Sequence, residues 1–201
     1  MGAAPAEFFG AGSEQIQQYV DLLLSRGIDW GLIGPREGER IWERHVLNCA
    51  ALAPLIPQGS TVVDVGSGAG LPGIPLAVLR PDLRVTLVES MARRTAFLDL
   101  AVADLELVDR VEVVRSRAEE HGGRYDVVVS RAVAALPRLL GWCTPLMKPT
   151  GRILALKGSS VREELAQAAP DLRRLKLTAT VHELVVPVCG EQSWAFEATR
   201  R

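Results

Sequence analysis

A run of glycines after an apolar segment is the feature of this sequence that most directly indicates chemistry. The segment Val62-Val63-Asp64-Val65 leads straight into Gly66-Ser67-Gly68-Ala69-Gly70, and a helical pattern follows. Glycines in such a turn let a ligand approach the backbone more closely than a side chain permits, and they adopt positive φ at little cost. A strand, a glycine-rich turn and a helix in succession indicate a nucleotide-binding site.

The spacing of the glycines bears on which nucleotide binds. A dinucleotide fingerprint needs G-x-G-x-x-G, but Leu71 stands at the third glycine position and the glycines fall as G-x-G-x-G. Asp64 precedes the turn, where a carboxylate suits an ammonium group, directly or through water, and would repel a pyrophosphate. S-adenosylmethionine carries an ammonium group and no phosphate, so the turn favours it over NAD. The predicted cofactor contacts here are Asp64, Gly66, Ser67, Gly68, Gly70 and Leu71.

Two further segments are expected to complete a nucleoside site. Glu89 closes the second apolar run, where a carboxylate accepts both ribose hydroxyls in NAD proteins and S-adenosylmethionine proteins alike. The stretch Ser116-Arg117-Ala118-Glu119 follows the third run, where an adenine ring would lie, although its glutamates equally suit the start of a solvated helix. The predicted contacts in these segments are Glu89, Ser90, Ala118 and Glu119.

Arg131, at the end of the fourth apolar run, is the candidate catalytic residue. Ligands of open α/β sheets lie beyond the carboxyl ends of the strands. The run is followed neither by an Asn/Asp-Pro-Pro-aromatic stretch for exocyclic amines nor by a cysteine that would attack a pyrimidine. S-adenosylmethionine donates its sulfonium methyl group, so the acceptor must be a nucleophile. Guanine N7 already has a free lone pair and needs neither of these groups, because alignment with the methyl group supplies most of the catalysis. Arg131 would then hold guanine O6 or a phosphate, and a structural ion pair is the alternative.

Several residues that can carry positive charge are candidates for contact with the substrate. The net charge of −1 and the pI of about 6.3 exclude a generally basic nucleic-acid binder but allow a local basic face. His45 lies on a partly apolar helical segment, where it equally suits packing, and Lys157 ends the fifth apolar run. The candidates are Arg44, His45, Arg131 and Lys157.

A sheet with helices on both faces must position these residues. The predicted strands cover residues 61–65, 85–89, 111–114, 126–130 and 152–157. The predicted helices between and after them cover residues 71–79, 91–104, 134–146 and 160–169. Continuous Val, Leu and Ile runs are typical of parallel strands covered on both faces, so the alternation predicts a doubly wound α/β sheet. Two strand-like runs at 175–186 and 193–199 predict an antiparallel hairpin at its edge.

The pattern before the sheet is helical. A helix is predicted from Ser13 to Gly27, with Tyr19 on its apolar face, and a second helix over residues 37–53. We find no internal repeat or linker, so residues 1–201 are predicted as one domain, with a helical cap over 1–58 and a cofactor-binding α/β core over 59–201.

Other features exclude whole classes of protein. No run approaches the roughly 18 apolar residues of a membrane span, and the N-terminus lacks a signal-peptide pattern, so a cytoplasmic protein is expected. The three cysteines and three histidines have no metal-ligand spacing, and no metal is expected. We expect a monomer.

With these segments in place, the sequence resembles the bacterial 16S ribosomal RNA guanine-N7 methyltransferases, formerly called glucose-inhibited division protein B. The resemblance is carried by Glu43-Arg44-His45-Val46-Leu47-Asn48, by Asp64 through the glycines to Leu71-Pro72-Gly73-Ile74-Pro75, by Ser130-Arg131-Ala132 and by Ala155-Leu156-Lys157-Gly158. It departs at Trp30-Gly31-Leu32-Ile33-Gly34, where the family usually has an Asn-Leu-Thr-like stretch.

The resemblance implies a Rossmann-like class I S-adenosylmethionine methyltransferase. The implied substrate is N7 of a guanine in 16S ribosomal RNA, presented on the small subunit or its precursor. The implied cofactor contacts are Gly66, Leu71, Ala118, Glu119 and Arg131, with Glu89 at the ribose.

Three other functions stay open on the sequence alone. The glycine turn and Glu89 also suit an NAD-dependent oxidoreductase. The near-neutral pI suits a methyltransferase acting on a small molecule or a protein. A non-catalytic nucleotide-binding module would keep the cofactor contacts without turnover.

Overall fold

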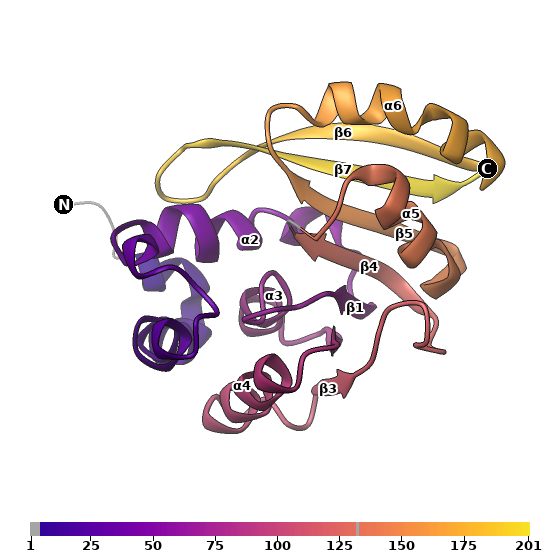
Figure 1. Cartoon of the computed structure of the whole chain (residues 1–201). Helices are drawn as coiled ribbons and strands as arrows, with labels where there is room; N and C mark the ends of the chain where they lie inside the picture. Colours follow the sequence, from indigo (N-terminus) through magenta and orange to yellow (C-terminus); the bar gives the residue numbers. More distant parts are fainter. Residues whose placement is uncertain (1–4, 132) are drawn as a thin grey trace.

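The computed structural model describes residues 5–131 and 133–201 and contains a seven-stranded sheet (Figure 1). Its strands are β1 (Thr61–Val65), β2 (Arg84–Glu89), β3 (Val111–Arg115), β4 (Tyr125–Arg131), β5 (Met147–Lys157), β6 (Leu177–Val185) and β7 (Gln192–Arg200). The order is β3-β2-β1-β4-β5-β7-β6, with β1 to β5 parallel and β7 antiparallel to both of its neighbours. The predicted doubly wound sheet and its terminal hairpin are therefore confirmed. Residues 1–4 of the expected cap, and Ala132 of the Ser130-Arg131-Ala132 motif, lie outside the described residues.

The helices largely follow the predicted segments. They are α1 (Ser13–Leu22), α2 (Asn48–Ala50), α3 (Gly73–Leu79), α4 (Ala92–Asp104), α5 (Leu136–Cys143) and α6 (Val161–Arg174). The single helix predicted over 37–53 is wrong in detail, because that stretch is a 3₁₀ segment (Pro35–Arg40), wide π-type turns (Ile41–Leu47) and the short α2. Helix α6 continues past Pro170, where the prediction stopped, because Leu172 beyond the proline is buried against the sheet.

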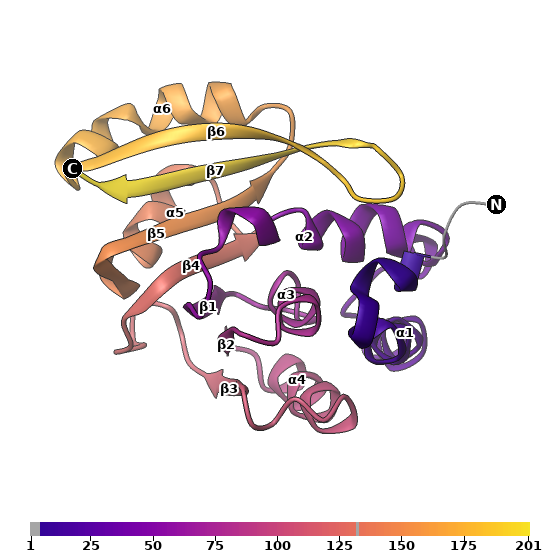
Figure 2. The same ribbon diagram turned by 180° about the vertical axis from the view of Figure 1, so that it is seen from behind.

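Each face of the sheet packs on its own apolar core. Val62 and Leu87 face one core, which also contains side chains of α1, α3 and α4, while Val63 and Val128 face the other, under α5 and α6. Figure 2 shows α1, α3 and α4 together on one side of the strands. Neighbouring residues of one strand thus point to opposite cores, which is why the strand sequences are continuously apolar.

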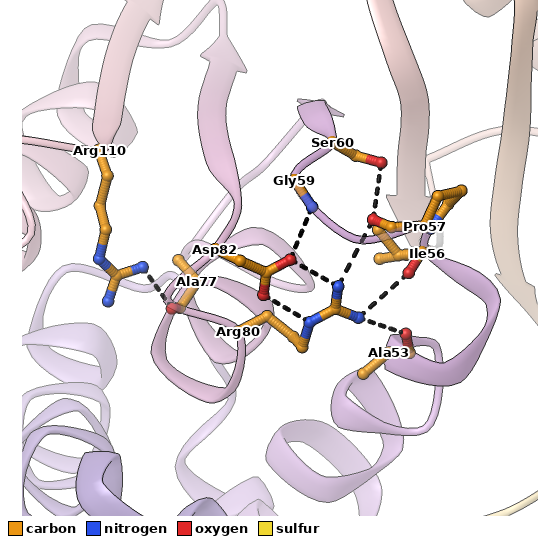
Figure 3. Close-up of polar contacts among 9 residues, drawn as sticks. All are labelled: Ala53, Ile56, Pro57, Gly59, Ser60, Ala77, Arg80, Asp82 and Arg110. Carbon is orange, nitrogen blue, oxygen red and sulfur yellow. Dashed lines mark hydrogen bonds and ion pairs between the residues drawn. The ribbon is translucent and has the colours of Figure 1, made fainter.

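Arg80, just after α3, joins the cap to the sheet (Figure 3). Its guanidinium donates to the carbonyl oxygens of Ala53 at 3.0 Å and Ile56 at 3.1 Å, near the end of the cap. It also pairs with Asp82, which accepts a hydrogen bond from the backbone N–H of Gly59 at 2.8 Å. The Arg80 side chain lowers the pKa of the Asp82 carboxyl well below its usual range. One side chain therefore bonds both the carbonyl groups at the end of the cap and the Asp82 carboxylate that follows α3.

Within the described ranges we find no helix with the length and apolar character needed to cross a membrane.

Candidate functional site

The glycine-rich loop is fixed at the carboxyl ends of β1 and β2. The backbone N–H groups of Gly66 and Ser67 donate to the carbonyl of Val88 at 2.9 and 3.1 Å. Gly66 and Gly68 have φ values of 69° and 61°, which an L side chain rarely adopts. A Cβ atom on Gly68 would meet only the carbonyl of Gly66, at 3.9 Å, so this position faces open space. The loop is a cradle in which a ligand can lie against the backbone.

Gly70, also predicted as a cofactor contact, has a different position. A Cβ on Gly70 would collide with Ile74, and its φ is 99°. Gly70 lines none of the pockets described below. Position 70 requires a glycine because the loop packs closely on α3 there.

Asp64, predicted to meet an ammonium group, lies beneath the loop and is fully buried. Its Oδ2 accepts hydrogen bonds from the hydroxyl of Ser67 at 2.7 Å and the backbone N–H of Gly73 at 2.9 Å, so the carboxylate shapes the loop and the start of α3. Its Oδ1 has no partner among the described residues. Burial raises the pKa of Asp64 to about 6, and the two hydrogen bonds oppose that rise. An incompletely satisfied buried carboxylate fits a cationic group bound above it.

Glu89 links the loop to the next strand end. Its Oε2 accepts from the backbone N–H of Gly68 at 3.1 Å, and its Oε1 accepts from that of Met91 at 2.9 Å. Arg94 approaches the same carboxylate at 3.5 Å. Glu89 is 3% exposed, so its carboxylate is held in one orientation at the edge of the cradle.

Two pockets meet at Glu89. The β3 pocket, of about 230 Å³, is lined by residues that include Gly66, Glu89, Ser90, Ala118 and Glu119. The loop pocket, of about 400 Å³, shares Gly66, Glu89 and Ser90 with it and adds Ser67, Gly68, Leu71, His45 and Arg131. The structure thus brings together all of the predicted cofactor contacts except Asp64, which lies beneath the loop, and Gly70, which packs on Ile74 of α3.

A third pocket lies beyond the ends of β4 and β5. This β5 pocket, of about 590 Å³, is lined by Arg44, Asn48, Arg131, Lys157 and Glu164 among others. Arg131 lines both it and the loop pocket. The candidate catalytic residue therefore lies at the boundary between the loop pocket and the β5 pocket, and the lining of the β5 pocket includes the basic side chains of Arg44 and Lys157.

Arg131 is held by residues of the cap. Its guanidinium donates to Nδ1 of His45 at 2.7 Å and to the carbonyl of Arg44 at 3.2 Å, and it lies 3.6 Å from the sulfur of Cys49. Among the contacts described for Arg131 there is no carboxylate. The alternative of a structural ion pair therefore finds no support in this geometry.

The other candidate RNA contacts differ in their exposure and in the hydrogen bonds that already occupy their side chains. The amino group of Lys157 donates to the carbonyl of Ala134 at 2.9 Å and to Glu164 at 2.7 Å, and its side chain is 10% exposed. His45 is bonded on both ring nitrogens, to Arg131 and to Glu37. Arg44 is the most accessible, with a side chain that is 58% exposed and a loose contact to Glu37 at 3.5 Å.

Sequence reasoning missed two residues that organise this site. Tyr19 donates its hydroxyl proton to the carbonyl of Ala69 in the glycine loop, and Glu37 accepts a hydrogen bond from His45 at 2.7 Å. A tyrosine on the buried face of a helix signals a need for an acceptor, which would have singled out Tyr19. Glu37 gave no comparable signal, because it lies in an irregular segment. No group of three His, Cys, Asp or Glu side chains suited to a metal occurs in the described part of the chain.

Comparison with known proteins identifies the family. The family model described as rRNA small subunit methyltransferase G (GidB) matches residues 12–193. The chain belongs to this family. A relative named ribosomal RNA small subunit methyltransferase G from Nocardioides sp. (strain ATCC BAA-499 / JS614) is 59% identical, over 92% of this chain and 80% of the relative. One of the same name from Mycobacterium leprae (strain TN) is 50% identical, over 90% of this chain and 74% of the relative.

Solved structures of more distant proteins share the fold. A ribosomal protein L11 methylase from Lactobacillus delbrueckii subsp. bulgaricus has a TM-score of 0.60 at 14% identity, covering 77% of each chain. The O-methyltransferase NcsB1 from neocarzinostatin biosynthesis, solved in complex with S-adenosylmethionine and 2-hydroxy-5-methyl naphthoic acid, has a TM-score of 0.60 at 17% identity, over 76% of this chain and 53% of that one.

Family membership confirms the resemblance seen in the sequence and the class of enzyme, a methyltransferase. It also confirms S-adenosylmethionine as the cofactor, and it disfavours the NAD-dependent alternative. The fold of the neighbours agrees with the predicted Rossmann-like methyltransferase architecture.

Proposed function

We propose that this methyltransferase transfers the methyl group of S-adenosylmethionine to N7 of a guanine in 16S ribosomal RNA. The observation that carries the proposal is the position of Arg131, which borders both the loop pocket and the basic β5 pocket. The names of the relatives specify ribosomal RNA of the small subunit. Guanine N7 as the acceptor comes from the family resemblance in the sequence motifs.

The cofactor would occupy the two pockets that meet at Glu89. The Glu89 carboxylate would accept the ribose hydroxyls, and the β3 pocket beside Ala118 and Glu119 would take the adenine. The methionine portion would lie in the loop pocket against Gly66 and Gly68. Asp64 would act from beneath the loop through its charge, and Gly70 would act by its close packing on α3.

The bound cofactor would supply a methyl group activated by the positive charge of its sulfonium sulfur. Guanine N7 has a free lone pair and loses no proton, so the reaction needs no general base. The main task of the protein residues would then be to align the guanine with the methyl group. Arg131 lies where its guanidinium can hold guanine O6, a neighbouring phosphate or the methionyl end of the cofactor. Arg44, and Lys157 with its partner Glu164, would line the space for the RNA.

We also propose that residues 1–201 form one domain. Described residues of the cap, from Phe9 to Ile56, share an apolar core with residues of the α/β portion, and this shared core supports the proposal. A ribosomal substrate would place the enzyme in the bacterial cytoplasm, acting as a monomer on the small subunit or its precursor.

Methyl transfer from labelled S-adenosylmethionine tests this function. Purified enzyme is incubated with naked 16S RNA, with unmodified small subunits, or with ribosome-free protein and metabolite fractions. We expect label in 16S RNA as N7-methylguanosine, mapped to one nucleotide. Label only in protein or metabolites would favour the other methyltransferase reading, and cofactor binding without label in any fraction would favour a non-catalytic module.

A further inference from the structure

Three side chains form a hydrogen-bonded chain that runs from the cap to the boundary of the two large pockets. Glu37 contacts Nε2 of His45 at 2.7 Å, and Nδ1 of His45 contacts the guanidinium of Arg131 at 2.7 Å. We propose that His45 is a positioning residue whose neutral imidazole holds Arg131 in place for methyl transfer, and that protonation of His45 switches the enzyme off. The proposal rests on the proposed function, since it concerns the same reaction.

The chemistry of arginine fixes the state of the ring. A guanidinium in a protein only donates hydrogen bonds, so Nδ1 of His45 at 2.7 Å must be an acceptor without a proton. Nε2 then carries the proton and donates it to the Glu37 carboxylate. Two partners of opposite kind therefore select one neutral tautomer of His45.

Burial and the charged groups around His45 decide whether the ring takes a second proton. Glu37 faces Nε2, Arg44 lies next along the cap, Arg131 faces Nδ1, and Glu89 and Arg94 line the same pocket. Burial and the charge of Arg131 lower the pKa of His45, and the Glu37 hydrogen bond opposes them. His45 therefore stays neutral at physiological pH.

A proton on Nδ1 would remove the acceptor and set two positive groups against each other. Arg131 would keep only the carbonyl of Arg44 at 3.2 Å and the weak acceptor Cys49. Its guanidinium would then leave the boundary between the loop pocket and the β5 pocket. A displacement of about 1 Å in an aligned site can cost on the order of a hundredfold in rate.

Two substitutions separate positioning from packing. In His45→Asn the short amide can present its oxygen where Nδ1 lies, so it keeps an acceptor for Arg131 but cannot titrate. In His45→Gln the longer amide reaches toward the Nε2 position and Glu37, so it keeps that contact and loses the acceptor. The two variants are otherwise similar in size and polarity, and each is the other's control.

We would measure kcat on small subunits at saturating cofactor from about pH 5 to about pH 8. The wild-type rate is expected to fall on the acid side, with the midpoint below the ordinary pKa of histidine. His45→Asn should keep most of the neutral rate and lose the acid fall, whereas His45→Gln should lose about tenfold to a hundredfold at every pH. The same acid fall in His45→Asn, or a wild-type rate in His45→Gln, would overturn the proposal.

Nitrogen-15 NMR of histidine-labelled enzyme gives a readout that needs no turnover. The chain has three histidines, so the signals of His45 are assigned by their loss in His45→Asn. At neutral pH we expect unprotonated Nδ1 and protonated Nε2. In Arg131→Gln, which lacks the positive charge facing Nδ1, we expect Nδ1 to become protonated at a higher pH than in the wild type. A mixture of tautomers in the wild type would overturn the proposal. If the wild type fails to methylate RNA while this signature is present, the proposed function fails and the positioning contact stands.

Discussion

The hydroxyl of Tyr19 donates a hydrogen bond of 2.7 Å to the carbonyl oxygen of Ala69, so the first helix of the cap holds the glycine-rich loop. Tyr19 is fully buried, and burial raises the pKa of its phenol well above the usual value, so the proton stays on the oxygen. The cap thus contacts the site in two places: Tyr19 bonds the glycine-rich loop, and His45 bonds Arg131.

Tyr19→Phe should weaken both the fold and the cofactor site. The ring is retained, but the buried carbonyl of Ala69 loses its partner, at a cost of about 1–2 kcal/mol of unfolding free energy. Cofactor affinity should fall severalfold, because the loop gains freedom. Chemical denaturation and calorimetric titration measure the two effects. Tyr125→Phe, which removes a hydroxyl bonded to His121 outside the pockets, is the matched control, and equal cofactor affinity in both variants would contradict the prediction.

Gly68→Val should abolish cofactor binding without unfolding the protein. A side chain at Gly68 would project into the open space of the loop pocket, so affinity should fall by about a hundredfold or more. Gly59→Val is the control, because Gly59 has a similar φ of 71°, has open space around it and lines none of the pockets. Both variants should show similar losses of stability. Cofactor affinity that falls equally in both would indicate backbone strain as the cause.

The sequence predicted the sheet better than the cap. Strands β1, β2, β4 and β5 each contain a run rich in Val, Leu and Ile, and a doubly wound sheet is the one common way to bury both faces of such strands. The cap carries no such constraint. Its segment from Pro35 to Leu47 folds into 3₁₀ and π-type turns, and His45 within it contacts Arg131, a residue far away in the chain that no local pattern reveals.

Among the candidate site residues, location was easier to predict than contacts. Gly68 and Glu89 both line the loop pocket, because a glycine turn and the end of a neighbouring strand meet at the same edge of the sheet, and their contact with the cofactor stays a prediction. Asp64 is predicted as a cofactor contact from its charge, but its hydrogen bonds to Ser67 and Gly73 depend on the loop conformation, which spacing alone does not define. Lys157 lines the β5 pocket, and its pairing with Glu164 could not be inferred before the start of α6 was placed.

The affinity for S-adenosylmethionine should rise with pH through about 6. The buried Asp64 has a pKa raised to about 6, and a bound cation favours its charged form, so binding should release a proton. The folding stability of the free protein should change with pH in the opposite direction. Because the pKa of Asp64 is raised from 3.8 to about 6 on folding, the contribution of this group to stability is lost as pH rises through that range. Calorimetric titration across this range should show the rise in the wild type and not in Asp64→Asn. An unchanged slope in Asp64→Asn would assign the proton to another group.

Arg80→Met should destabilise the fold without touching the cofactor site. The guanidinium bonds two carbonyl groups at the end of the cap and the Asp82 carboxylate, so its loss should cost about 2–3 kcal/mol (Figure 3). Arg162→Met, which removes an exposed pair with Glu183, should change stability by less than about 0.5 kcal/mol. Urea denaturation compares the variants. A stability loss that is the same in both would show that the junction at Arg80 is no stronger than a surface ion pair.

Arg44→Gln should weaken binding of the RNA substrate and leave cofactor binding unchanged. The side chain of Arg44 is largely exposed and lines the β5 pocket, where a phosphate can replace its loose contact with Glu37. Removing one phosphate contact should raise KM for small subunits and lower the slope of log affinity against log salt concentration by about 1. Arg174→Gln, an equally exposed arginine at the far end of α6, is the control and should leave the slope unchanged. A KM effect without a change in slope would mean that Arg44 acts through its carbonyl contact with Arg131 and does not meet the RNA itself.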